Sequence, residues 1–112
     1  MLFYISYSCG CGNNEEIISA NNYNKAEEYA YNCAIEEYES YEGLHGIRSM
    51  GDILEDEFGV SFSDDNADDY YEEAQDIYNE EVENTISYSA ELYNEKEHSW
   101  LLESQNGEAY EI

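Results

Sequence analysis

The sequence predicts an α+β fold in which an antiparallel sheet packs against about three helices, in the order ββαααβββ. Apolar residues and β-formers recur with strand-like spacing near both ends of the chain. The middle of the chain instead repeats its apolar residues at helical spacing. Strands and helices come in runs without β-α alternation, which indicates α+β. No internal repeat or linker interrupts the 112 residues, so residues 1–112 are predicted to form a single acidic domain.

The first two elements are predicted to form a β-hairpin. Residues 2–8 (LFYISYS) are apolar or β-forming and indicate a strand, and residues 15–20 (EEIISA) indicate a shorter one. Between them, residues 9–14 (CGCGNN) contain two glycines and two asparagines. These residue types favour a tight turn because they tolerate positive φ angles.

The first helix is predicted over residues 24–41. Asn24 can cap its first turn, and Glu27 three residues later completes a capping-box pattern. Small apolar residues and tyrosine recur along one side, with glutamates on much of the remainder. Gly43 and Gly46 then end the helix.

Two more helices are expected before the chain returns to strands. Ser49 can cap a short helix (SMGDILEDEF), and Gly59 stands where a helix C-terminal glycine belongs. Residues 60–65 form a connection. The third helix is predicted over residues 67–83, with one apolar stripe expected to face the sheet: Tyr70, Ala74, Ile77, Tyr78 and Val82.

The C-terminal part of the chain is predicted to complete the sheet. Residues 86–93 (ISYSAELY) alternate as a half-buried strand does, and residues 99–104 (SWLLES) indicate another strand. Asn106 and Gly107 match a type I′ hairpin turn. Residues 109–112 are therefore predicted to be a short final strand.

The charge of the chain limits its partners. There are 28 acidic and 3 basic residues, for a formal net charge of −25. A protein that binds nucleic acid directly needs basic residues against phosphates, and a protein that binds anionic membranes needs them against lipid headgroups. Both classes are excluded. The charge far exceeds the magnitude of about 2–8 that solubility requires, so it calls for a functional explanation.

The densest acidic segment is the third predicted helix. Residues 64–83 hold ten acidic residues in twenty positions and no basic one. Carboxylates three or four positions apart lie about 5–6 Å from one another on a helix, a scale similar to that of successive phosphates on a nucleic-acid strand. A solvated helix face is the alternative interpretation. The predicted partner-binding residues are Asp65, Asp68, Asp69, Tyr71, Glu72, Glu73, Asp76, Glu80 and Glu81.

Metal binding and catalysis are the other possibilities. Cys9, Cys11 and Cys33 with His45 (or His98) could supply three thiolates and an imidazole to zinc. The C-x-C spacing is tighter than that of a zinc knuckle, and Cys33 also fits a buried helix stripe. We therefore expect no cofactor, with zinc as the alternative. No spacing typical of a catalytic family surrounds the cysteines or histidines, so an enzyme is not expected.

The chain resembles the small acidic DNA-mimic proteins of phages and mobile elements, which include anti-CRISPR and anti-restriction proteins. The resemblance lies in size, in charge and in the segment ADDYYEEAQDIYNEEVE, and it covers mainly residues 27–97. It implies a stoichiometric inhibitor that occupies the DNA-binding groove of a host defence nuclease, a CRISPR effector such as Cas9 or a restriction enzyme. The alternative function is an adaptor or regulator of another basic protein.

The expected compartment follows from what the sequence lacks. Residues 1–7 are apolar but have no basic segment before them, as a signal peptide would. No stretch approaches the roughly 20 apolar residues of a membrane span. Three cysteines do not pair into a disulfide framework. We therefore expect the cytoplasm of a host bacterial cell.

Overall fold

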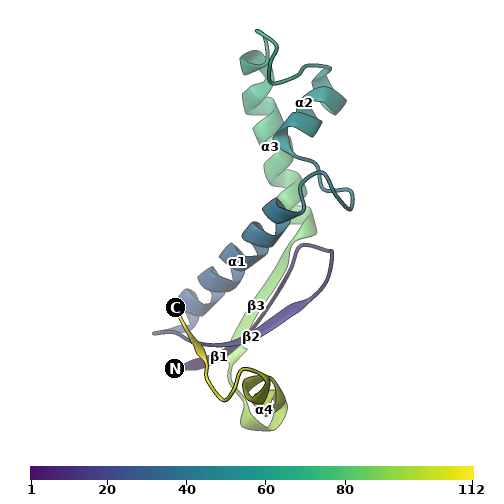
Figure 1. The fold of residues 1–112 in the computed structure, drawn as a ribbon. Helices are drawn as coiled ribbons and strands as arrows, with labels where there is room; N and C mark the ends of the chain where they lie inside the picture. The colour runs from purple at the N-terminus through teal and green to yellow at the C-terminus, as the bar shows by residue number, and fades with distance from the viewer. The chain divides into compact units, whose positions relative to one another are not determined.

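A computed structural model describes residues 1–112 of the chain (Figure 1). These residues form two compact units. Unit 1 comprises Met1–Glu37 and Ile86–Ile112, and unit 2 comprises Tyr38–Thr85. Four helices and a four-stranded sheet confirm the predicted α+β class, although the order is ββαααβαβ. None of the helices combines the length and the apolar character that crossing a membrane requires.

The sheet of unit 1 is built on the predicted hairpin. β1 (Leu2–Ser8) and β2 (Asn14–Ser19) pair antiparallel. β3 (Ser87–Leu92) adds antiparallel to β1, and β4 (Tyr110–Glu111) adds to β2, giving the order β3-β1-β2-β4. The β4 pairing is parallel, so the sheet is mixed and not purely antiparallel as predicted.

One face of this sheet is covered by α1 (Tyr23–Ser40), the helix predicted over residues 24–41. Its alanines let the helix backbone lie close to the strands. The cap differs from the prediction: the Asn22 Oδ1 atom accepts the Lys25 N–H at 2.9 Å, so Asn22 takes the place expected for Asn24. The core that forms beneath the helix contains Phe3, Ile5, Ile18, Ala20, Ala26, Ala30 and Ala90.

The prediction of a strand over residues 99–104 is wrong, because that segment lies in α4 (Glu95–Ser104). Asn94 caps the helix by accepting the Lys96 N–H at 2.9 Å. At the other end, the Gly107 N–H donates to the Leu102 carbonyl at 2.8 Å. Asn106 and Gly107 do adopt the positive φ angles of a type I′ turn, 62° and 75°. Here the same conformation ends a helix, and the short segment after it returns as β4.

Unit 2 contains α2 (Met50–Phe58) and α3 (Asp68–Thr85). Both ends of α2 are as predicted, because Ser49 caps the helix and Gly59 ends it in the left-handed conformation at φ 67°. The Asp52 side chain completes a reciprocal capping box with Ser49, which was not predicted. The connection between the helices consists of turns. Buried side chains of both helices and of the connection form the core of this unit: Ile53, Leu54, Val60 and Ala74.

Candidate functional site

The apolar stripe of α3 determines which residues of that helix face solvent. Ala74 is fully buried against α2, and Tyr70, Ile77 and Tyr78 pack around the same core. The stripe is therefore correctly predicted, but its partner is not, because it packs on α2 and not on the sheet. Two amphipathic helices joined by a short connection bury their apolar sides most readily against each other.

The opposite side of α3 carries the predicted carboxylates. At 100° per residue, the positions 69, 72, 76 and 80 lie within about a quarter turn, on the side opposite Ala74. Each pair of neighbours three or four positions apart adds like-charge repulsion. We call these exposed residues the α3 acidic face: Asp68, Asp69, Glu72, Glu73, Asp76 and Glu80.

Two of the predicted residues, Asp65 and Tyr71, lie outside this face. Asp65 is exposed in the turn that precedes α3. Tyr71 is 46% exposed, and by the same 100° rule it falls between Tyr78 and Val82, on the side of the helix away from this face. The structure thus leaves eight of the nine predicted partner-binding side chains open to solvent.

Glu81 is the exception, because its carboxylate is paired with Arg48 within unit 2. It follows Ile77 by four positions and so stands on the packed side of α3, where it is only partly exposed. The Arg48 guanidinium donates from Nε to Glu81 at 3.2 Å and makes a second contact through Nη2. Its Nη1 atom also contacts Glu57 at 3.1 Å and Asp56 at 3.4 Å.

Arg48 is the only lysine or arginine of unit 2, and its guanidinium connects α2 to α3. Unit 2 has sixteen acidic residues against this one arginine. The hydrogen bonds that Arg48 donates to Glu81 are the first cause of a raised Arg48 pKa, so the guanidinium keeps its charge over the whole pH range in which the protein is folded. No cation of this unit remains to neutralise the α3 acidic face. Sequence spacing could have identified Glu81 as a packed residue, but nothing in the sequence links it to Arg48.

Within unit 1, the three cysteines and His98 do not come together as a group of metal ligands. Cys9 is buried in the hairpin turn, Cys11 is exposed, and Cys33 is half-buried on α1. Burial raises the pKa of the Cys9 and Cys33 thiols, which disfavours the thiolate that zinc requires. His45 is exposed in unit 2, where its ring contacts Tyr41 at a centroid distance of 5.5 Å.

A different set of three side chains that can act as metal ligands does lie close together: Glu91, Glu97 and His98. His98 is buried and stacks on Tyr4 with centroids 4.2 Å apart. Its Nδ1 atom accepts the Asn94 N–H at 3.0 Å, which places the proton of the neutral ring on Nε2, 3.1 Å from Glu91 Oε1. A metal at Nε2 would compete with this arrangement. His98 thus joins β3 to the start of α4.

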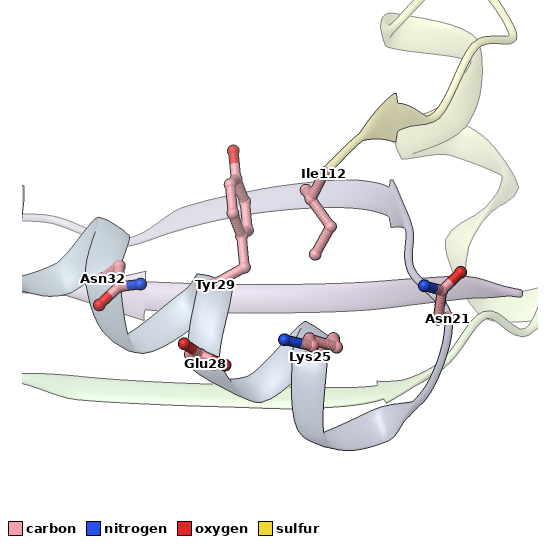
Figure 2. A pocket seen from close by; sticks show the side chains of 6 residues that line it. All are labelled: Asn21, Lys25, Glu28, Tyr29, Asn32 and Ile112. Carbon is pink, nitrogen blue, oxygen red and sulfur yellow. The ribbon is translucent and has the colours of Figure 1, made fainter.

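Two pockets flank α1 in unit 1. Figure 2 shows the first, a space of about 330 Å³ lined by Lys25, Glu28 and Ile112 among others. The second pocket, of about 340 Å³, is lined by residues of α1 and by Tyr88 of β3, and no lysine or arginine lines it. Its lining consists of Asn24, Glu27, Glu28, Tyr31 and Tyr88. None of these five residues was predicted as a site.

Comparison with known proteins adds no further assignment. A scan against protein-family models, a search of curated proteins and a search of solved structures each find no match to this chain.

Proposed function

We propose that this protein inhibits a nucleic-acid-binding protein by presenting the α3 acidic face to its basic groove in place of phosphates. The observation that supports this most directly is electrostatic. The carboxylates of the face are exposed along a single helix, and the one cation of the unit is bound elsewhere, to Asp56, Glu57 and Glu81. A solvated face stabilised for its own sake would carry lysines at the i+4 positions.

The target class is a host defence nuclease, such as Cas9 or a restriction enzyme. These proteins expose lysine- and arginine-rich grooves to duplex DNA, and a rigid row of carboxylates competes with DNA for such a groove. The inhibition is stoichiometric and needs no catalysis, because binding alone blocks access.

The test is a DNA-cleavage assay with a purified Cas9–guide RNA complex and, in a parallel arm, a restriction endonuclease. We expect the parent protein to inhibit one of them at stoichiometric concentration, and excess DNA to relieve the inhibition. The variant Asp69→Asn, Glu72→Gln, Asp76→Asn, Glu80→Gln removes four charges from the face at nearly constant side-chain volume. Because interfacial charge pairs contribute about 1.5 kcal/mol or more each, its inhibition constant should rise at least about a hundredfold.

A matched control separates position from total charge. The variant Glu36→Gln, Glu103→Gln, Glu108→Gln, Glu111→Gln removes four exposed carboxylates from unit 1. It should inhibit like the parent protein. Equal loss in both variants would show that net charge alone matters, and retained inhibition in the α3 variant would exclude this face as the interface. If neither nuclease is inhibited, the target class is wrong, and the alternative of another basic partner takes its place.

A further inference from the structure

The two edges of the unit 1 sheet differ in whether their outward backbone groups are hydrogen-bonded. On the β2 side, the edge is closed: the Gln105 side chain bonds both backbone groups of Ile17, and the Ile112 N–H donates to the Ser19 carbonyl at 3.3 Å. On the other side, β3 is the last strand. The Tyr93 N–H donates to the Leu2 carbonyl at 3.0 Å, which fixes the alternation of the ladder.

Because the ladder alternates, every second residue of β3 points its backbone N–H and C=O groups away from β1. The outward residues are Tyr88, Ala90 and Leu92, each with one free-edge N–H and C=O. Natural edge strands are usually protected by lysine, proline or a bulge. β3 has neither residue, and its register with β1 runs unbroken over six positions. This edge is open to another strand.

The side chains beside this edge are suited to a cation. Register with Ile5, a core residue beneath α1, places Ala90, and with it Tyr88, on the α1 face of the sheet. There Tyr88 meets Tyr31 edge to face, with ring centroids 5.2 Å apart and each residue 40% exposed. Both rings line the second pocket described above, which no lysine or arginine lines. Glu27 and Glu28, one turn before Tyr31 on α1, also line this pocket.

We propose that unit 1 binds an extended, arginine-containing segment of a partner protein as a fifth strand on β3, with an arginine side chain in this pocket. A strand added to β3 points alternate side chains toward the α1 face. A guanidinium there can pair bidentately with a carboxylate and stack on tyrosine. The charge of −25 opposes pairing with a second copy of this chain, so the added strand must be basic. This site is separate from the α3 acidic face.

The probe is a fluorescein-labelled peptide of about six residues, the common strand length, in which arginine alternates with threonine and valine. Binding is measured by fluorescence anisotropy at about 0.15 M salt. Amide hydrogen exchange of the ¹⁵N-labelled protein is followed by NMR with and without the peptide. We expect the outward amides of Tyr88, Ala90 and Leu92 to become protected. A peptide N-methylated at alternate amides should not bind, because it cannot pair with the edge.

The pocket is tested separately from the edge. The variant Glu27→Gln, Glu28→Gln should weaken binding about tenfold or more, and replacing arginine by lysine in the peptide should do the same. The variant Glu103→Gln, Glu108→Gln removes the same charge elsewhere and should bind like the parent protein. Absence of binding, unchanged exchange at the three amides, or equal weakening in both charge variants would each overturn the proposal. Leu92→Pro, which removes one outward N–H at an exposed position, should also reduce binding.

Discussion

The side-chain amide of Gln105 takes the place of a neighbouring strand for Ile17. Its Oε1 atom accepts the Ile17 N–H at 2.8 Å, and its Nε2 atom donates to the Ile17 carbonyl at 3.0 Å. Nε2 also donates to the Glu108 carbonyl at 3.0 Å. Both Gln105 and Ile17 are buried, so these backbone groups have no water to replace the amide. One glutamine at the end of α4 thereby closes an edge of the sheet.

Gln105→Leu should destabilise the protein by about 2–4 kcal/mol, because it leaves two buried backbone groups without partners. Gln105→Glu should also destabilise it at neutral pH, since an ionised carboxylate cannot donate to the Ile17 carbonyl. A protonated carboxyl can donate, so the folded state raises the pKa of the introduced group. The stability of this variant should be highest in acid and fall as pH rises through that pKa. Urea denaturation followed by circular dichroism measures both effects, and a Gln105→Leu midpoint equal to that of the parent would contradict the assigned role.

Arg48→Met should destabilise unit 2 by about 1–2 kcal/mol. The change removes charged hydrogen bonds that connect α2 and α3, and the value is reduced because the pairs are partly solvated. Adding Glu81→Gln should recover part of the loss, because the unpaired carboxylate is then removed. A double-mutant cycle of urea midpoints measures the coupling. Additive effects of the two changes would show that Arg48 and Glu81 do not stabilise each other.

Inhibition by the α3 acidic face should depend steeply on salt. Exposed carboxylates attract a basic groove over a Debye length of about 10 Å at 0.1 M salt and about 3 Å at 1 M. The association rate should therefore fall strongly between low salt and about 0.5 M, while dissociation changes less. Stopped-flow or surface plasmon resonance kinetics with the inhibited nuclease provide the measurement. A flat salt dependence would contradict phosphate mimicry.

Alkaline pH should unfold the protein because four tyrosines are held in their neutral form. Burial, followed by the Glu15 hydrogen bond, raises the pKa of Tyr4 to about 12. Burial and nearby glutamates likewise raise the pKa of Tyr7, Tyr29 and Tyr78 above the usual value. Since the unfolded chain releases these protons at lower pH, stability is retained below about pH 10 and lost as pH rises through the folded-state values.

Tyrosinate absorbance and circular dichroism, recorded together from neutral to alkaline pH, test this coupling. A late step in tyrosinate formation should coincide with loss of the folded signal. Tyr78→Phe removes the hydroxyl that donates to Glu42 at 2.5 Å, so it should shift the alkaline transition to higher pH. Tyrosines that all titrate at their ordinary value while the fold persists would contradict the assigned burial.

The sequence by itself determined those features that depend on near neighbours in the chain. Ser49 and Asp52 form a capping box because they are three positions apart, and Gly59 ends α2 because glycine readily adopts a positive φ. The apolar stripe of α3, and hence its acidic opposite face, follows from helical periodicity alone. Composition likewise sets the net charge of −25.

The tertiary structure decided what depends on residues far apart in the sequence. Asn106 and Gly107 suit a hairpin turn and a helix end equally, and packing of His98 and Leu101 selected the helix. Gln105 meets Ile17 across 88 positions, and Arg48 meets Glu81 across 33. Local propensity carries no information about such contacts, because their free energy arises only when folding removes both groups from water.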